Sequence, residues 1–255
     1  QSEKQKNIWK SRVSREIKLA IDVQKQLMPK RSIKNFPVEG LNIAATEISG
    51  DFYDFYPHND CIYFTLCDVS GKGVNAGMVM ARAITLFKIF SKNKYKPDEI
   101  HFEMNNELYE TNPRGVYVTS VVGCYMLEND TIELSNAGHI PALFKENNKF
   151  TEYSSSSLPL GVKRAASIDN YKIDKFKLGQ GRLYSFTDGF SECRDELGNE
   201  LGIDGVKKLI NEFSNSSLKK EINQIAKHIE TNSSKKVSSV EKILEDDLTI
   251  IGIGK

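Results

Sequence analysis

Four aspartates or aspartate pairs occupy positions where a carboxylate could do chemistry. Each lies at the edge of an apolar, strand-like stretch: Asp51 in ISGDFYDFY, Asp68 in TLCDVSGKG, Asp188 in YSFTDGFSE, and the Asp246-Asp247 pair in EDDLTIIGI. A carboxylate beside an apolar core is costly unless its charge is compensated. Several of them at strand ends, with glycines nearby, suit a hard divalent cation such as Mg²⁺ or Mn²⁺. Such a set could hold two ions about 3.5–4 Å apart, an arrangement that hydrolyses phosphate esters.

Each aspartate also has an ordinary structural interpretation, because Asp-Gly is a common turn and aspartate often caps a helix. The metal hypothesis therefore depends on the whole set. The run DVSGKGVNAG invites comparison with a phosphate-binding loop, but Lys72 is followed by Gly73 rather than Ser or Thr, and Leu66 occupies the place of the first glycine. We instead predict a tight strand-to-helix turn that leaves the Val69 carbonyl facing a metal.

The histidines and cysteines give weaker signals. His139, in NAGHIP, is a candidate general acid, and a turn histidine satisfied by backbone is the alternative. His58, His101 and His228 are interpreted as surface or loop residues. The four cysteines form no CxxC pair, so we predict buried free thiols and a reducing, cytoplasmic location, although a longer parent protein could be membrane-anchored. They are Cys61, Cys67, Cys124 and Cys193.

The elements that must position these residues follow from the hydrophobic pattern. The pattern predicts strands over 41–48, 61–67, 116–127, 131–134, 142–145, 182–187 and 248–253. It predicts helices over 74–90, 97–110, 205–212 and 219–232, and a loop over 154–157. Strands, helices, strands, helices and a final strand indicate a mixed α+β domain with antiparallel sheets rather than a regular βαβ winding.

The N-terminal arm differs from the rest of the chain in charge. Residues 1–35 carry ten Lys/Arg and three Asp/Glu, a charge of +7, whereas the remainder carries 25 against 31, a charge of −6. Apolar residues recur at steps of four and three, which predicts a helix that Pro29 ends. The seam comprises Val13, Ile17, Ala20, Gln24 and Leu27, widened by Ile21 and Met28. The helix could pack on its own domain or pair with a second copy. We divide the chain into a linker or dimerisation helix, 1–35, and a second domain, 36–255.

The overall composition excludes several classes of protein. The 255 residues are 39% hydrophobic and 27% charged, which is typical of a globular chain. A net charge of +1 argues against a nucleic-acid partner. No apolar run approaches the roughly 20 residues needed to span a bilayer, so we expect no membrane segment here. The chain begins Gln1-Ser2-Glu3, without an initiator Met or a signal-peptide pattern, and we expect it to be part of a longer protein.

Six spaced motifs resemble a known family. SGDFYDFY, CDVSGKGVNAGMVMA, LSNAGHIPAL, LPLGV, LYSFTDGFSECRDELGNELG and DDLTIIGI occur in the order found in SpoIIE/RsbU-type serine phosphatases, bacterial members of the metal-dependent PPM (type 2C-like) superfamily. The resemblance extends over residues 22–254, and EIKLAIDVQKQLMP resembles the helix that joins the phosphatase to an upstream sensor domain. It implies a layered sandwich of two antiparallel β-sheets flanked by α-helices, preceded by that helix.

The resemblance also implies roles for individual residues. Asp51 matches a metal ligand, Asp68 the carboxylate that bridges both ions, and Val69 a backbone carbonyl ligand; Asp188 and Asp246 match further ligands. Asp247 is the alternative to Asp246, and Asp54 either supports the ligands or is structural. Two Mn²⁺ or Mg²⁺ ions would activate a water as the nucleophile, without a phospho-enzyme intermediate. No arginine can be assigned to hold phosphate, so phosphate affinity is expected to rest mainly on the metals.

The implied substrate is a small STAS-domain protein, an anti-sigma factor antagonist phosphorylated on Ser or Thr, whose dephosphorylation releases a sigma factor by partner switching. The alternative is a weakly active, phosphatase-like binding or regulatory module. A further hypothesis concerns regulation: dimerisation of the arm would move the Asp68 turn and so change metal occupancy.

Overall fold

The structure is a computed structural model that describes residues 3–29, 37–45, 47–194, 199–214, 216–233, 235–236, 242–244 and 246–254. Two five-stranded antiparallel sheets form its centre. The first has the order β1 (Val38–Ile43), β12 (Leu248–Gly254), β9 (Arg182–Phe186), β6 (Ala142–Glu146), β7 (Lys149–Tyr153). The second has the order β2 (Phe52–Pro57), β3 (Cys61–Val69), β4 (Val118–Met126), β5 (Thr131–Ala137), β8 (Asp174–Lys177).

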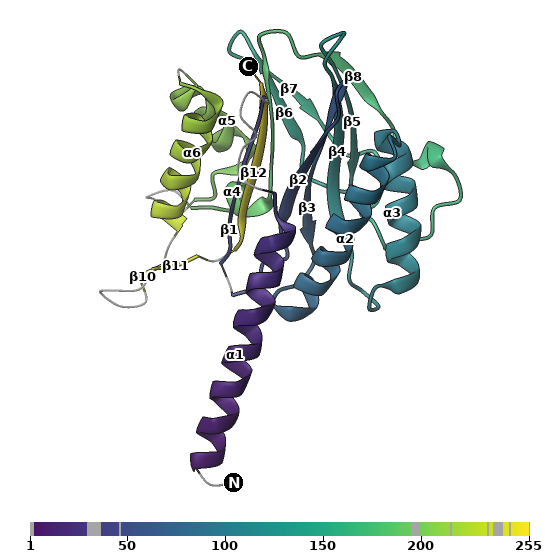
Figure 1. Ribbon diagram of the computed structural model, residues 1–255. Helices are drawn as coiled ribbons and strands as arrows, with labels where there is room; N and C mark the ends of the chain where they lie inside the picture. The colour runs from purple at the N-terminus through teal and green to yellow at the C-terminus, as the bar shows by residue number, and fades with distance from the viewer. Residues whose placement is uncertain are drawn as a thin grey trace.

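Helices cover the outer face of each sheet, as Figure 1 shows. The second sheet carries α2 (Val74–Lys92) and α3 (Pro97–Thr111), and the first carries α5 (Gly202–Phe213) and α6 (Leu218–Ser233). The smaller elements are α4 (Asp188–Ser191), η1 (Ile168–Asn170) and the paired β10 (Lys235–Lys236) and β11 (Lys242–Ile243). The expected layered sandwich of two antiparallel sheets flanked by helices is therefore confirmed.

Three apolar layers hold the sandwich together. Between the sheets lies a cluster that includes Phe64, Leu66 and Ile251, all fully buried. Outside the second sheet, Phe52, Phe87 and Met104 belong to the layer beneath α2 and α3. Outside the first sheet, Phe186 and Ile225 belong to the layer beneath α4, α5 and α6. Since burying one such side chain contributes about 1.5–3 kcal/mol, these layers fix how the strand ends of the two sheets meet.

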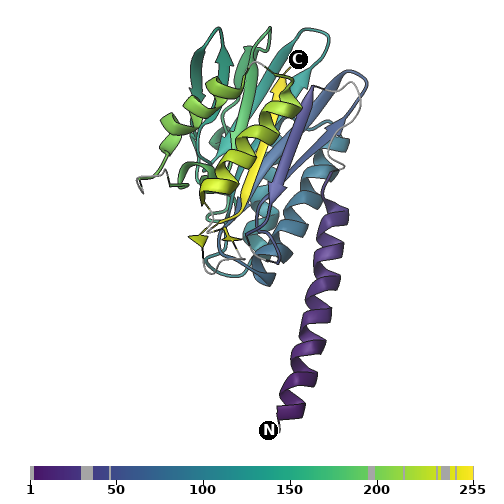
Figure 2. The ribbon, with the colours of Figure 1, turned by 90° about the vertical axis from the view of Figure 1, so that its left-hand side faces the viewer.

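The predicted N-terminal helix is α1 (Glu3–Leu27), which projects away from the sandwich (Figure 1 and Figure 2). Only its C-terminal end touches the domain: Leu27 and Met28 pack against the layer under α2, and Lys88 Nζ donates to the Leu27 carbonyl at 2.5 Å. The predicted domain boundary at 35/36 lies outside the described residues and stays a prediction.

The strand expected over 41–48 was wrong at both ends, because β1 spans Val38–Ile43. Beyond it, the backbone amides of Ala45 and Gly50 donate to the Asp247 carboxylate rather than to a neighbouring strand, at 2.7 and 3.1 Å. Asp51 consequently precedes β2 and does not end a strand. The aromatic strand β2 and the polar edge strands β7 and β8 were not predicted.

Helix α2 is long and apolar enough, by length and composition, to cross a membrane, with a mean hydropathy of 1.2 over an 18-residue window. Its apolar face is buried within the domain, including Val79, Met80 and Phe87. Part of this hydropathy therefore serves packing against the second sheet, whereas Val74 and Met78 on the same helix are exposed.

Candidate functional site

A pocket of about 350 Å³ opens at the end of the sandwich where strands of both sheets meet. Three of the predicted aspartates line it together with the predicted backbone carbonyl residue. Its lining includes Asp68, Val69, Lys72, Tyr117, Thr119, His139, Asp188 and Asp246. The aspartates come from distant parts of the chain: Asp68 is in β3, Asp188 opens α4 after β9, and Asp246 precedes β12. The fold thus brings these predicted residues to one place.

Asp68 and Val69 end β3, and the chain then turns sharply into α2, as the sequence predicted. Gly71 and Gly73 make this turn with φ of 93° and 77°, a conformation that glycine adopts without a steric penalty. Two hydrogen bonds secure it: the Ser70 amide donates to the Tyr117 carbonyl at 2.9 Å, and the Tyr117 amide donates to Ser70 Oγ at 3.0 Å. The turn is thereby held in position beside the pocket.

Asp51 is not part of the pocket lining, but it contacts Asp68, which is, and it is 4% exposed. Its carboxyl contacts Thr187 and Asp68, yet its Oδ2 is buried without a hydrogen-bond partner. Burial, followed by the charge of Asp68, raises the pKa of Asp51 well above its ordinary value. A buried carboxylate that lacks a donor is unfavourable, so this group is compensated either by a proton, which the raised pKa favours, or by a cation.

The carboxylates of the pocket repel one another. Burial and then the neighbouring Asp188 raise the pKa of Asp68 to about 6. Burial and then Asp246 raise the pKa of Asp188. Such crowding of acidic groups is typical of sites that act on charged ligands, and positive charge supplied to this pocket would relieve it.

The structure separates the two neighbours Asp246 and Asp247. Asp246 faces the pocket. The Asp247 carboxylate instead packs against the loop before β2, where it accepts from the Ala45 amide, the Gly50 amide and Ser49 Oγ. Ser49 Oγ in turn accepts from the Asp51 amide at 3.1 Å. Asp247 therefore shapes the loop that carries Asp51, a role that the sequence analysis missed.

Lys72 and His139 also line the pocket. Lys72 Nζ lies 3.1 Å from an Asp246 carboxylate oxygen, which gives the site a positively charged group although no arginine was predicted there. Both ring nitrogens of His139 are engaged: Thr119 Oγ1 lies 2.8 Å from Nδ1, and Nε2 lies 2.9 Å from the Phe186 carbonyl. Burial lowers the pKa of His139 to about 4, so the buried imidazole is neutral at pH 7. This arrangement favours the structural interpretation of His139 over a general acid.

The donor set suits Mg²⁺ or Mn²⁺, since it consists of carboxylate oxygens and a backbone carbonyl. The unpartnered Oδ2 of Asp51 points to the same conclusion. Among the described residues, however, no three His, Cys, Asp or Glu side chains already stand in a geometry that could hold a metal ion. The ligand roles of Asp51, Asp68, Val69, Asp188 and Asp246 therefore stay predictions.

Two expectations outside the pocket can be compared with the structure. His101 is fully buried on α3, with Ser135 Oγ 2.9 Å from Nδ1 and Ser120 Oγ 3.0 Å from Nε2, so its interpretation as a surface residue was wrong. The prediction of buried free thiols is confirmed for all four cysteines.

Comparison with known proteins places this geometry in context. Residues 58–254 match the family model of Stage II sporulation protein E (SpoIIE). The phosphoserine phosphatase RsbU of Bacillus subtilis (strain 168) is 24% identical over 217 residues, which cover 84% of this chain. The chain spans 64% of the length of RsbU.

Solved structures share the fold. The SiaA-PP2C domain of Pseudomonas aeruginosa superposes with a TM-score of 0.82 at 15% identity, covering 96% of this chain and 98% of that one. RsbX, crystallised in complex with magnesium, superposes with a TM-score of 0.61 at 15% identity, covering 87% of this chain and 97% of that one. The sandwich described above is thus the PP2C-type fold.

Proposed function

This chain belongs to the SpoIIE family, and from that premise we propose that it is a Mn²⁺- or Mg²⁺-dependent protein phosphatase that hydrolyses phosphoserine or phosphothreonine on a protein substrate. The observation that carries the proposal is the convergence of Asp68, Asp188 and Asp246 on one pocket, with the buried Asp51, whose Oδ2 has no hydrogen-bond partner, in contact with Asp68. When ionised, such a cluster is strongly unfavourable beside a core without cations to compensate its charge.

Five residues would hold the two ions. Asp68 contacts Asp51, and its pKa is raised by the charges of Asp188 and Asp246. Asp68 would therefore serve both ions, and Val69 would offer its backbone carbonyl. Two such ions, when bound, supply an activated water and neutralise charge on the phosphoryl group. The RsbX complex with magnesium supports this choice of metal for the fold.

The remaining residues of the pocket prepare it for a phosphate ester. Lys72, half exposed at the pocket, attracts the anionic group and offers hydrogen bonds to its oxygens. Thr187 holds Asp51, while Asp247 and Ser49 fix the loop that precedes it. His139 is anchored between Thr119 and the Phe186 carbonyl, and it joins the loop after β5 to the end of β9.

The substrate and pathway follow from the family rather than from the pocket. RsbU is named a phosphoserine phosphatase. We infer that the substrate of this chain is a phosphorylated STAS-domain protein, an anti-sigma factor antagonist, and that the reaction takes place in the cytoplasm, under an upstream sensor domain in the parent protein.

Hydrolysis of p-nitrophenyl phosphate tests the chemistry. Turnover should require Mn²⁺ or Mg²⁺ and should stop with a chelator. Asp188→Asn should keep the fold yet lower turnover by at least about 100-fold, because a neutral amide cannot replace a carboxylate that holds an ion. Asp204→Asn, on the exposed face of α5, is the matched control and should behave like the parent protein.

Near-normal turnover by a folded Asp188→Asn protein would contradict the assignment of Asp188 as a metal ligand. Equal, background-level rates of the parent protein with metal and with chelator would instead favour the alternative, a phosphatase-like binding module. Phosphate release from phosphorylated STAS-domain proteins of the same genome tests the substrate, and activity on p-nitrophenyl phosphate without activity on any of them would reject the substrate class alone.

A further inference from the structure

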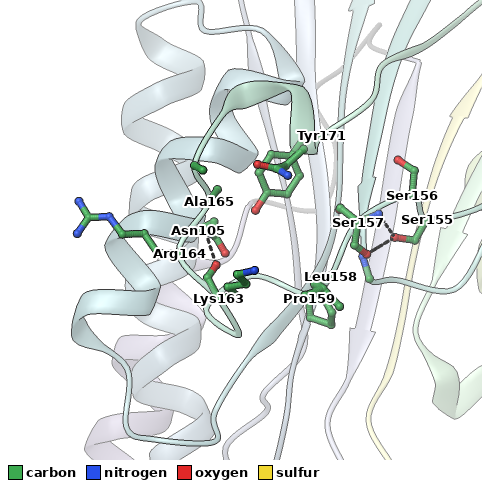
Figure 3. Close-up of a pocket in the computed structure, with 13 residues that line it drawn as sticks. Asn105, Ser155, Ser156, Ser157, Leu158, Pro159, Lys163, Arg164, Ala165 and Tyr171 are labelled. Atoms are coloured by element: carbon green, nitrogen blue, oxygen red, sulfur yellow. Dashed lines mark hydrogen bonds between the residues drawn. The ribbon is translucent and has the colours of Figure 1, made fainter.

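A second pocket, of about 590 Å³, adjoins the carboxylate pocket (Figure 3). Gly138 lines both of them, so the two pockets meet at this residue. Gly138 has a φ of 67°, and a Cβ there would lie 2.4 Å from Pro159 Cγ. The backbone at Gly138 therefore packs directly against Pro159 of the second pocket, with no room for a side chain between them.

The loop that forms the second pocket, residues 154–167, is tied down along its length. Ser155 Oγ accepts from the Gly138 amide at 2.6 Å, and Leu160 exchanges backbone hydrogen bonds with Val118 at 2.7 and 2.9 Å. Asn105 of α3 donates from Nδ2 to the Lys163 carbonyl at 3.0 Å and accepts at Oδ1 from the Gly161 amide, also at 3.0 Å. A long irregular loop held this firmly beside a candidate site is typical of a binding element.

Lys163 and Arg164 both line this pocket, but they differ in their surroundings. Arg164 pairs with Glu110 at 3.0 Å and points away from the other labelled residues in Figure 3. Lys163 is exposed and forms no salt bridge with any described acidic residue. It lies between Asn105 and the Leu158-Pro159 segment (Figure 3). The pocket thus offers an ammonium group that has no acidic partner within the described part of the chain.

Apolar side chains surround the same region. Leu158 is 57% exposed and Val162 is 46% exposed, both in the loop, and Tyr117 is 40% exposed where it lines the carboxylate pocket. Val118, the residue that follows Tyr117, forms a β-bridge with Leu160 of the loop, so the loop lies next to this part of the chain. Exposed apolar side chains around a polar pocket are typical of a surface that receives another polypeptide.

We propose that this pocket receives the segment of the phosphoprotein substrate next to the phosphorylated residue, and that Lys163 pairs with an acidic side chain on that segment. The inference rests on the proposed phosphatase function. Its basis is Gly138, which lines both pockets, the charge of Lys163, and the exposed apolar side chains of Leu158, Val162 and Tyr117. The pocket would then select substrates, while the aspartates carry out hydrolysis.

Phosphoserine peptides test this directly. An otherwise neutral peptide is made with one Asp or one Lys placed in turn at each position on both sides of the phosphoserine. At one or two adjacent positions, Asp should give a kcat/KM about threefold to tenfold above Lys, the range expected for one partly enclosed ion pair. Lys163→Glu should reverse this preference, whereas Arg164→Glu, the matched control, should keep it.

Turnover of p-nitrophenyl phosphate separates the possible failures, because that substrate has no flanking residues. Lys163→Glu should hydrolyse it at the parent rate. A parent protein inactive on p-nitrophenyl phosphate would contradict the proposed function itself. A parent protein active on it, but with a flat charge profile or no activity on any peptide, would overturn the inference about the second pocket. The same holds if Lys163→Glu leaves the preference unchanged.

Discussion

At the scale of single residues, Lys72 places a positive charge beside a crowded set of carboxylates, and under the proposed function it would also contact the phosphate ester. Lys72 and Asp246 have half-exposed side chains, 52% and 38%, so their ion pair contributes little to folding. We expect Lys72→Met to raise the KM for p-nitrophenyl phosphate by about tenfold, the loss of one charge-assisted contact, with a smaller change in kcat. Initial rates measured over a range of substrate concentrations at saturating Mn²⁺ check this.

The control for Lys72 is Lys94→Met, because Lys94 has the same exposed fraction and forms its own ion pair with Asp60. It should leave the KM unchanged. A Lys72→Met protein whose KM is normal but whose Mn²⁺ requirement has shifted would show that Lys72 positions Asp246 and does not bind phosphate.

His101 makes the stability of the domain sensitive to acid. It is buried between Ser120 and Ser135, and burial lowers its pKa to about 3. In the unfolded chain its pKa is about 6.5, so between that pH and about pH 3 the unfolded state binds a proton that the folded state does not bind. His101 therefore leaves the free energy of unfolding undiminished above about pH 6.5. As the pH falls from there towards 3, His101 lowers this free energy by about 1.4 kcal/mol per pH unit.

His101→Gln can keep one hydrogen bond to each serine but cannot titrate. Its free energy of unfolding should therefore depend less steeply on pH, with a slope lower by about 1.4 kcal/mol per pH unit well below pH 6.5. Chemical denaturation of both proteins over a series of pH values measures the difference. Parallel curves would show that His101 is not the responsible group, whatever the stability of the variant at neutral pH.

At the scale of elements, α1 holds the loop that carries Asp51. Gln24 Nε2 donates to the Ser49 carbonyl at 2.6 Å, and the Ser49 amide donates to Gln24 Oε1 at 3.1 Å. On α2, a Cβ at Gly77 would lie 2.2 Å from Ile48 Cγ2 and 3.6 Å from Gln24 Nε2. Helix α1, the loop and α2 thus meet at one junction, two residues before Asp51. The sequence hypothesis placed the influence of the arm at the Asp68 turn, whereas this contact is with the Asp51 loop.

Replacing Gln24 tests whether this junction matters to the site. Gln24→Ala removes both hydrogen bonds and should lower stability by about 1–2 kcal/mol. It should also raise the Mn²⁺ concentration needed for half-maximal activity several-fold, because the Asp51 loop loses its contact with α1. Gln26→Ala, exposed on the same helix, is the control. If the parent protein, Gln24→Ala and Gln26→Ala all need the same Mn²⁺ concentration, the contact between α1 and the Asp51 loop does not influence the metal site.

The elements that could be predicted are those with a strong local pattern. Helices α2 and α3, the long strand β4 and the final strand β12 each carry apolar residues that recur at the expected period. Edge strands β7 and β8 read as KFTEY and DKFK, and their exposed polar residues give no such signal. The end of β1 depends on amides that bond to Asp247, which lies about 200 positions along the chain, and no local pattern can report that contact.

At the scale of the whole molecule, the site belongs to neither sheet alone. Asp51 and Asp68 come from the second sheet and its connections, while Asp188 and Asp246 flank strands of the first. The motifs could indicate which aspartates matter, since each stands beside a glycine or a strand. Their convergence, the exclusion of Asp247 from the pocket and the contribution of Lys72 arise only when the sheets pack, so these features could not be derived from spacing.

The N-terminal half of α1 contacts no part of the described sandwich (Figure 2), and its positive charge contrasts with the acidic remainder. Trp9, 65% exposed, stands four residues before Val13, at the start of the predicted seam. Only the C-terminal end of the seam, at Gln24 and Leu27, is engaged by the domain. The two interpretations of the seam are therefore compatible: one end packs on the domain, and the other is free to pair with a second copy.

Pairing of α1 would place two domains on one helical stem, and the junction at Gln24 would connect that stem to the Asp51 loop. Val13→Asp combined with Ile17→Asp should weaken self-association of the full chain at least about tenfold, since charge is disfavoured in a helical seam. The same variant should need more Mn²⁺ for activity.

Ser11→Asp, on the opposite face of the helix, is the control and should change neither self-association nor the Mn²⁺ requirement. Sedimentation and Mn²⁺ titration measure both effects. If the full chain is monomeric at all concentrations, or if the monomeric variant has an unchanged Mn²⁺ requirement, then pairing of α1 does not control the metal site.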